Sequence, residues 1–271
     1  MGDWTRWPPP FRTFVGILHE SAGAVRIVGD LRSLIRLLVD ILLFRVLGLF
    51  SIPGRNRDRE IRLKDGTRIV YRLNRGDIQS IREVWMDEVY RLPSPILPGV
   101  VIDLGANIGL TSLWLARRHA PTRVIAVEPS PQNARLVRLN LSRNGVPATV
   151  VEAAAGARDG TARFSASADS NQGQLGEDGE EVPVISMSTL LREHAPGQSV
   201  ALMKMDIEGG EQDLLSSNTE WLSRIPVVLA EFHPDRVDYP GLIGKLESAG
   251  FVYHRPDHRV LFMDCFTRTG G

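Results

Sequence analysis

The sequence predicts an α/β fold built around a doubly wound, mainly parallel sheet, and three observations lead to this prediction. From residue 99 onward, short apolar runs alternate with longer stretches of helical character, in the order strand, helix, strand. The first apolar run, residues 100–104, is nearly continuous, as in strands buried on both faces. Gly105 and Gly109 follow it and precede helix-like sequence, a turn typical of ligand-binding α/β sheets.

Composition limits the kind of protein. The 271 residues suffice for one α/β domain of ordinary size and an appendage. A formal net charge of zero gives no indication of a nucleic-acid partner, and a single cysteine, Cys265, excludes an internal disulfide framework and a cysteine-rich zinc site. Because the first residues lack the basic region and apolar core of a signal peptide, we expect a cytoplasmic protein.

Residues 1–59 are predicted to form an amphipathic helical segment. Charges interrupt the apolar residues 25–50 before any run reaches the roughly 18 residues of a membrane-spanning helix. Most of these charges recur at near-helical spacing, which leaves a broad apolar face on one helix. Two interpretations stay open: the face packs on this protein or a second subunit as in a homodimer, or it makes a peripheral membrane contact with arginines toward the headgroups. The charges are Arg26, Asp30, Arg32, Arg36, Asp40 and Arg45.

Residues 60–98 are predicted to be a lead-in or cap for the main domain. Residues 60–73 alternate well enough for two short strands joined at Asp65-Gly66, a favoured tight-turn pair. A helix is expected over residues 77–90, and prolines then interrupt regular structure before the first core strand.

Residues 99–271 are predicted to form the main domain. Ser130 and Pro131 provide a cap and a first-turn proline for a helix that ends near Asn144. A polar, glycine-rich stretch over residues 165–181 is expected to be a mobile loop, and a C-terminal hairpin adds an antiparallel strand to the sheet. The strands are expected over residues 100–104, 123–127, 148–152, 161–167, 182–185, 200–206, 226–232, 251–254 and 260–267, and the other helices over 111–119, 212–217 and 242–249.

An acid and two glycines define the candidate ligand site after the first strand. Asp103 precedes Gly105 and Gly109, with Ala106 and Asn107 between the glycines. Such a turn lets backbone approach a ligand closely, and the following helix N-terminus favours anionic groups. Dinucleotide folds need G-x-G-x-x-G, whose middle glycine is absent here, and a carboxylate suits a cation. The compact cationic nucleoside S-adenosyl-L-methionine is therefore the expected cofactor, and a methyltransferase the expected class.

Two further strand ends extend the expected cofactor site. Glu128 ends the second strand, where an acid can accept hydrogen bonds from both hydroxyls of a ribose. Glu152 and Ala153 end the third strand and are expected at the adenine edge, where small residues leave room for the ring.

Three carboxylates gather where the fourth strand ends. Asp206 is expected on the same sheet edge as Glu128, to contact the cofactor and to serve catalysis. Glu208 and Glu211 flank a Gly-Gly turn and would be neighbours on a helix, where like charges cost stability. They are expected to form a lip of the substrate pocket. In the alternative interpretation, Glu208 caps its helix and Glu211 is solvated.

Four motifs in this order resemble the FkbM family of S-adenosylmethionine-dependent methyltransferases. They are VIDLGANIG at 101–109, AVEPSP at 126–131, LMKMDIEGGE at 202–211 and LAEFHPD at 229–235. The resemblance covers residues 60–265 and implies a class I methyltransferase fold and, usually, O-methylation of a hydroxyl on a sugar or secondary metabolite. One departure is Leu191, which stands where an acid is expected after the Thr-Leu pair.

The fifth strand ends in the candidate base. Alternation puts Glu231 and His233 on one face, near Asp206 across the sheet. An alcohol is a poor nucleophile until its proton is removed, and histidine suits proton removal near neutral pH. His233 is therefore expected to be the base, with Glu231 or Asp206 fixing its tautomer. A purely structural histidine at a strand end is the alternative.

One alternative keeps these residues but gives them a metal, and two others are different classes of protein. Asp206, Glu231 and His233 could instead hold Mg²⁺, which would orient two substrate oxygens and lower the pKa of a hydroxyl. An NAD-dependent oxidoreductase is disfavoured by the absent middle glycine. A module that binds the cofactor without catalysis also stays open. The acceptor is expected to be a small molecule or glycan, and the amphipathic N-terminal segment favours a glycolipid.

Overall fold

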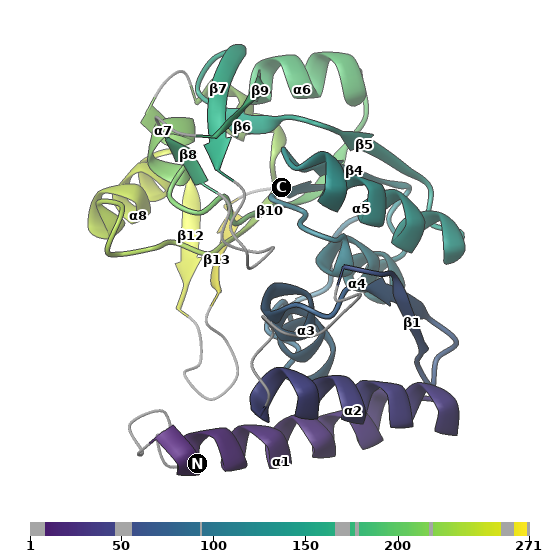
Figure 1. Ribbon diagram of the computed structural model, residues 1–271. Helices are drawn as coiled ribbons and strands as arrows, with labels where there is room; N and C mark the ends of the chain where they lie inside the picture. Colours follow the sequence, from purple (N-terminus) through teal and green to yellow (C-terminus); the bar gives the residue numbers. More distant parts are fainter. Residues whose placement is uncertain are drawn as a thin grey trace.

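The central sheet has seven strands and the expected doubly wound α/β arrangement. The computed structural model describes residues 9–46, 56–92, 94–165, 174–176, 179–216, 219–255 and 263–269. The strands of the sheet are β3 Val100–Leu104, β4 Arg123–Val127, β5 Ala148–Val151, β10 Val200–Met205, β11 Val227–Ala230, β12 Phe251–His254 and β13 Asp264–Arg268. Their order across the sheet is β12-β13-β11-β10-β3-β4-β5 (Figure 1).

The strand order places the ligand-binding edge. Strands β5, β4, β3, β10 and β11 are parallel, and the chain passes from β3 outward to β5 before it returns to β10 on the other side of β3. Ligands of such sheets bind at the carboxyl ends of the strands, beside this switch point. The predicted C-terminal antiparallel strand is confirmed as β13, which lies between β11 and β12 and is antiparallel to both.

Helices cover both faces of the sheet. Ser130 caps α5 by accepting a hydrogen bond from the backbone N–H of Asn133, as the Ser-Pro pair predicted. One hydrophobic cluster includes α4 and α5, and a second includes α6, α7 and α8 on the other face. The helices are α4 Leu110–His119, α5 Pro131–Arg143, α6 Met187–His194, α7 Glu211–Ser216 and α8 Tyr239–Ser248, with a short 3₁₀ turn, η4 Glu220–Arg224.

A second, four-stranded sheet follows the third core strand, in the order β6-β9-β7-β8. The prediction of a loop over residues 165–181 is wrong where β8 pairs with β7, with Phe164 opposite Leu175. A three-residue strand is too short to show a period-two pattern, so the sequence gives no signal for it. Residues 166–173 and 177–178 lie outside the described part of the chain. The strands are β6 Ala154–Gly156, β7 Gly160–Ser165, β8 Gln174–Gly176 and β9 Glu180–Ser186.

The N-terminal segment forms two helices, α1 Pro9–Ile27 and α2 Leu31–Val46, so the prediction of one helix over residues 25–50 is wrong. The helical segment is interrupted at Gly29, whose N–H donates to the Arg62 carbonyl. A Cβ at this position would lie 2.6 Å from the Leu63 carbonyl oxygen, so only glycine fits there. Residues 47–50 lie outside the described part. Within the described residues, no helix has both the length and the apolar character to cross a membrane.

The lead-in region contains the predicted hairpin and helix. Strands β1 Arg59–Arg62 and β2 Arg68–Tyr71 pair antiparallel around the expected Asp-Gly turn. Helix α3 Arg75–Ile81 begins two residues before the predicted start and continues as a π-helical turn, η3 Arg82–Met86. A π-helical turn is common at functional sites, and η3 here borders the pocket described below.

One hydrophobic core joins the N-terminal helices, the hairpin β1–β2, α3 and η3 to helices α4 and α5 of the main domain. Helices α1 and α2 lie side by side at the bottom of Figure 1. The π-helical turn η3 contacts both α1 and α4. Buried polar contacts reinforce this core, since Asp40 of α2 accepts from the Tyr71 hydroxyl at 2.6 Å and from Arg59 at 2.8 Å. The lead-in helix is thereby fixed against the binding edge of the sheet.

Candidate active site

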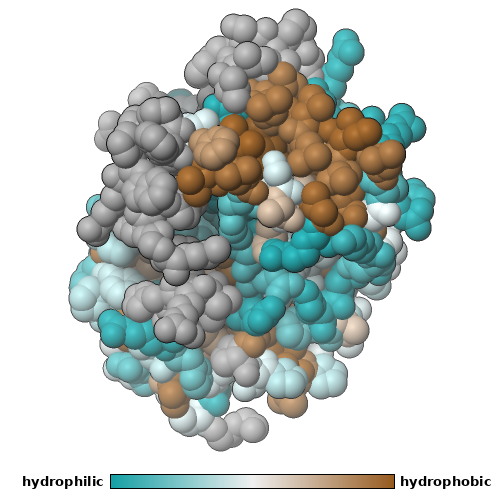
Figure 2. Space-filling view, turned by 90° about the horizontal axis from the view of Figure 1, so that it is seen from below, coloured by the Kyte–Doolittle hydropathy of each residue, from teal (hydrophilic) through white to brown (hydrophobic). Residues whose placement is uncertain are grey.

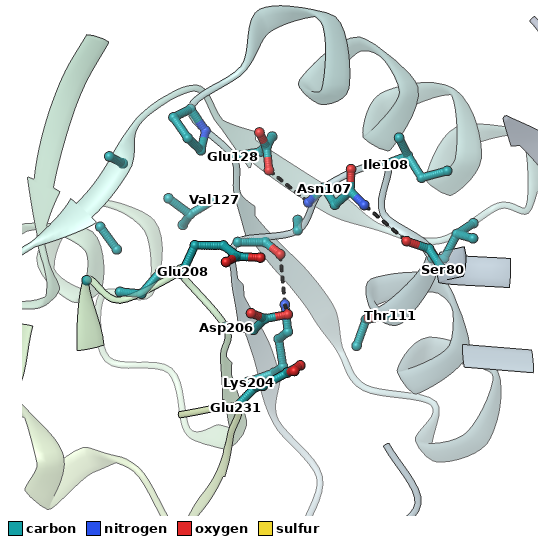
Figure 3. A pocket seen from close by; sticks show the side chains of 18 of the residues that line it. Ser80, Asn107, Ile108, Thr111, Val127, Glu128, Lys204, Asp206, Glu208 and Glu231 are labelled. Atoms are coloured by element: carbon teal, nitrogen blue, oxygen red, sulfur yellow. Dashed lines mark hydrogen bonds and ion pairs between the residues drawn. The ribbon is translucent and has the colours of Figure 1, made fainter. Parts of the chain in front are cut away.

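A pocket of about 360 Å³ lies at the carboxyl ends of β3, β4, β10 and β11 (Figure 3). Its size falls in the range usual for small-molecule sites. The glycine turn after β3 forms one wall and the loop after β10 another. Helices α3 and η3 of the lead-in region close a third side with Gln79, Ser80 and Glu83.

The glycine turn can be made only by these glycines. Gly105 has φ +73°, and a Cβ there would come within 1.8 Å of the Asp206 carbonyl oxygen. Gly109, at φ +81°, packs on Val137 of α5 and shapes the turn without lining the pocket. Between them, Ala106 and Asn107 line the pocket together with Gly105.

Asn107 and Glu128 join the glycine turn to the end of β4 and to α3. The Asn107 backbone N–H donates to Glu128 Oε2 at 2.8 Å, and its side-chain Nδ2 donates to Ser80 Oγ at 3.1 Å. Asn107 itself has a left-handed φ of +50°. Glu128 is buried at the pocket wall and also accepts from the Ser130 N–H at 2.9 Å. Burial raises the pKa of Glu128 to about 7.

Asp103 does not reach the pocket, contrary to the prediction that it faces the cofactor. Its side chain is fully buried behind the turn, where Oδ2 accepts from Ser112 Oγ at 2.6 Å. The positive charge beside Asp103 is that of Lys204, whose Nζ lies 3.2 Å from Asp103 Oδ1, and not that of a cofactor as predicted. Asp103 therefore supports the turn from beneath.

Lys204 is a pocket residue that the sequence analysis did not identify. Although burial by itself lowers the pKa of a lysine, the carboxylates Asp103 and Asp206 raise the pKa of Lys204 above its ordinary value. Its Nζ donates to the Gly105 carbonyl at 2.7 Å and lies 3.7 Å from Asp206 Oδ2. Lys204 thus ties the glycine turn of β3 to the end of β10. The available signal was a single lysine inside an apolar strand, since a buried charge needs a partner.

Carboxylates crowd the part of the pocket beside the ends of β10 and β11. Asp206, Glu208 and Glu231 line the pocket there (Figure 3). Glu83 of η3, which the sequence did not single out, lines it as well. The charge of Asp206, and then burial and Glu83, raise the pKa of Glu231 to about 9. Asp206 and Glu231 therefore resist ionising together, and the protonated carboxyl of the pair can donate a hydrogen bond.

His233 lies in the same pocket, but its nearest acids are not the predicted ones. Its Nε2 lies 3.5 Å from Glu208 Oε2 and its Nδ1 lies 3.9 Å from Glu211 Oε1. No contact of this closeness joins it to Glu231 or Asp206 among the described residues. The reason is the turn after β10, which carries Glu208 at a left-handed φ of +56° back toward the loop after β11.

Glu208 lies at the pocket, as the sequence predicted, whereas Glu211 does not. Glu208 lines the pocket as expected and accepts a hydrogen bond from Arg236 Nη1 at 2.9 Å, so it does not cap the helix. Glu211 is fully buried, neither solvated nor part of the lip. It accepts from the Ile207 N–H at 2.9 Å, just before α7.

At the third strand the structure separates the two predicted residues. Ala153 lines the pocket with Ala154 and Ala155. Glu152 points away, is exposed, and pairs with Arg138 of α5 at 2.5 Å, so its predicted place at the adenine edge is wrong. The three alanines give this part of the wall small side chains, and Phe164 of β7 lines the pocket as well.

This strand order, with a glycine turn after the first strand and a buried acid after the second, defines a class I S-adenosylmethionine-dependent methyltransferase. Within that class, the chain belongs to the family of the methyltransferase FkbM domain, which matches residues 103–253, more than half of the chain. The predicted family, enzyme class and cofactor are confirmed, and the oxidoreductase alternative is set aside.

Two curated methyltransferases are similar to this chain over about two thirds of its length. The 31-O-demethyl-FK506 methyltransferase FkbM of Streptomyces tacrolimicus is 28% identical over 226 residues, which cover 69% of this chain and 84% of the relative. Methyltransferase 1 of Beauveria bassiana is 24% identical, with 65% and 82% covered. The AMB antimetabolite synthetase AmbE of Pseudomonas aeruginosa is 40% identical over 87 residues, but these are 31% of this chain and only 4% of that protein. The solved structure of M. jannaschii TYW2 in complex with AdoMet aligns with a TM-score of 0.41 at 14% identity, over 80% of this chain and 89% of that one.

Proposed function

We propose that this protein transfers the methyl group of S-adenosylmethionine to a hydroxyl oxygen of a sugar, glycolipid or secondary metabolite by direct displacement. The observation that carries the proposal is His233, which faces the pocket beside two carboxylates. An alcohol needs a base before it becomes a good nucleophile, and histidine serves this purpose near neutral pH. The relative from Streptomyces tacrolimicus, by its name, methylates an O-demethyl compound, which supports oxygen as the acceptor.

The cofactor side of the proposal uses the walls of the glycine turn. Glu128 would accept hydrogen bonds from the ribose hydroxyls, and the turn backbone at Ala106 and Asn107 would contact the cofactor directly. Ala153 would border the adenine. Asp206, at the end of β10, would face the amino-acid portion of the cofactor and the acceptor.

For this reaction the protein has to orient the acceptor hydroxyl toward the methyl group and remove the hydroxyl proton. The sulfonium of S-adenosylmethionine supplies an activated methyl group and a neutral leaving group. His233 would take the hydroxyl proton of the acceptor as the oxygen attacks. Glu208 and Glu211, at 3.5 and 3.9 Å, would stabilise the imidazolium that forms.

The chemistry is tested by locating the transferred methyl group. The protein is incubated with S-adenosylmethionine and a panel of hydroxylated sugars, glycolipids and polyketides, each matched with its deoxy analogue. We expect S-adenosylhomocysteine to form only with the hydroxylated member of a pair, and NMR of the product to show an O-methyl group. Methylation of a deoxy analogue, or a methyl group on nitrogen or carbon, would show that the proposal is wrong.

A metal-assisted version of the same reaction is the second candidate, and specific geometry supports it. Asp206, Glu211 and His233 each offer one ligand atom within 4.8 Å of the others. Glu211 Oε2 and His233 Nδ1 are buried without a hydrogen-bond partner among the described residues. Glu211 thus replaces Glu231 in the ligand set that the sequence indicated. A histidine ligand suits Mn²⁺, Fe²⁺ or Zn²⁺ better than Mg²⁺.

Chelation separates the two candidates. With His233 as the base, activity is expected to survive extensive EDTA treatment and removal of the chelator, and elemental analysis is expected to find less than stoichiometric metal. Loss of activity that Mn²⁺ or Zn²⁺ restores would establish the metal-assisted reaction instead. Buffer-exchanged protein without EDTA serves as the control.

A further inference from the structure

Helices α1 and α2 expose a continuous apolar surface to solvent. Of the nine large hydrophobic side chains that are exposed in the described part of the chain, seven lie on these two helices. Figure 2 shows them as one hydrophobic area over α1 and α2, viewed from the side opposite the sheet. A patch of this kind marks an interaction surface, because scattered exposed residues would not gather on one face. We name it the hairpin face: Phe14, Leu18, Val25, Leu31, Ile35, Val39 and Leu42.

In the pair of helices α1 and α2, the acidic side chains are buried and the exposed charged side chains are basic. Both acids within the two helices are buried against the body of the protein, Glu20 with Arg45 at 2.6 Å and Asp40 with Arg59 at 2.8 Å. The exposed charged residues of the described parts of α1 and α2 are instead arginines: Arg32, and Arg26, whose guanidinium also donates to the Met86 carbonyl of η3. The outward surface of the helices is therefore apolar and basic.

More basic charge lies where the two helices join. Lys64 of the β1–β2 turn is exposed and donates from Nζ to the Val25 carbonyl at 3.0 Å, which places its ammonium at the C-terminal turn of α1. The one exposed acid of residues 13–45 is Asp30, and its carboxylate accepts from the backbone and hydroxyl of Ser33 at 2.9 and 2.7 Å.

From these features we propose that the hairpin face docks on an anionic lipid surface. An apolar stripe with basic residues at its rim matches a membrane interface, where side chains enter the acyl boundary and cations meet acidic headgroups. The sequences attached at the other end of the hairpin, before Pro9 and after Val46, have the composition of interfacial segments. They contain Trp4, Arg6 and Trp7 on one side and Leu47, Leu49, Phe50 and Arg55 on the other.

The docked hairpin would hold the pocket near the membrane. Its inner side packs on η3, and the same short helical segment supplies Glu83 to the pocket wall. The proposal concerns the surface of the protein and does not depend on which acceptor is methylated, so its test and the test of O-methylation fail separately.

Vesicle flotation of the full-length protein tests the proposal. We expect the protein to float with phosphatidylcholine vesicles that contain phosphatidylglycerol, more weakly with pure phosphatidylcholine, and less at high salt. The Ile35→Glu/Leu42→Glu variant is expected to lose at least about tenfold in partitioning, because each exposed side chain contributes apolar burial at the interface. The Arg26→Gln/Arg32→Gln variant is expected to lose the preference for anionic vesicles.

The matched control places the same change on apolar residues exposed elsewhere. Leu97→Glu and Val252→Glu are expected to float as the unchanged protein does, since both lie outside the hairpin face. Circular dichroism confirms that every variant is folded. Equal partitioning of the Ile35→Glu/Leu42→Glu variant and the unchanged protein would overturn the proposal. So would a vesicle-independent dimer in sedimentation that this variant dissociates, since the face would then bind a second copy.

Discussion

Replacing His233 with alanine is expected to lower the turnover number by about two orders of magnitude or more. The physical reason is that the acceptor hydroxyl then loses the group that takes its proton, while the pocket keeps its shape. S-adenosylmethionine is expected to bind as before, because Glu128 and the glycine turn lie on the other wall. Steady-state kinetics and calorimetric titration of the cofactor measure the two effects separately.

His254→Ala is the matched control for this substitution. The ring of His254 forms a 2.6 Å hydrogen bond with Thr267 Oγ1 at the outer strands and does not line the pocket. Its loss is expected to leave turnover within a few-fold of the unchanged enzyme. Near-normal turnover in His233→Ala would refute the base assignment. A parallel loss of cofactor affinity would make His233 a cofactor ligand.

Replacing Lys204 with methionine is expected to lower the free energy of unfolding by about 3–5 kcal/mol. Methionine fills a similar volume but leaves Asp103 fully buried without its ion-pair partner. The Gly105 carbonyl also loses its 2.7 Å hydrogen bond, so S-adenosylmethionine is expected to bind more weakly as the turn loosens. Urea denaturation followed by circular dichroism measures the loss of stability.

A double substitution distinguishes an unpaired charge from a packing defect. Asp103→Asn together with Lys204→Met removes both charges and is expected to be less destabilised than Lys204→Met alone. The exposed Lys64→Met is the control for removal of a lysine and is expected to change stability by less than about 0.5 kcal/mol. A loss below about 1 kcal/mol in Lys204→Met would contradict the assigned role.

The sequence predicted most of the sheet because each core strand is a short apolar run that ends at a recognisable turn. The same logic located Glu128, Asp206 and Glu231, since the carboxyl ends of parallel strands meet at one edge. His233 followed from alternation one step further along the chain. All four of these residues line the pocket.

What the sequence could not predict depends on contacts between distant segments. Lys204 meets Asp103 only through the register of β10 beside β3. Glu83 enters the pocket because η3 is packed between α1 and α4, a position that no local pattern encodes. Glu152 was misplaced because the strand ends at Val151, one residue early, which turns the glutamate toward α5. Residue spacing therefore predicts where a strand ends, but it does not predict the direction of the side chains that follow the strand.

The shared core beneath the N-terminal helices has a consequence for protein production. The inner residues Leu37 and Ile41 of α2 pack in the same cluster as Ile61 and Tyr71 of the lead-in hairpin and Leu113 of α4. A chain shortened to residues 103–253, which match the family, is therefore expected to expose Leu113 and the rest of its side of this apolar cluster to water. A shortened chain that keeps the cluster intact has to begin no later than α1.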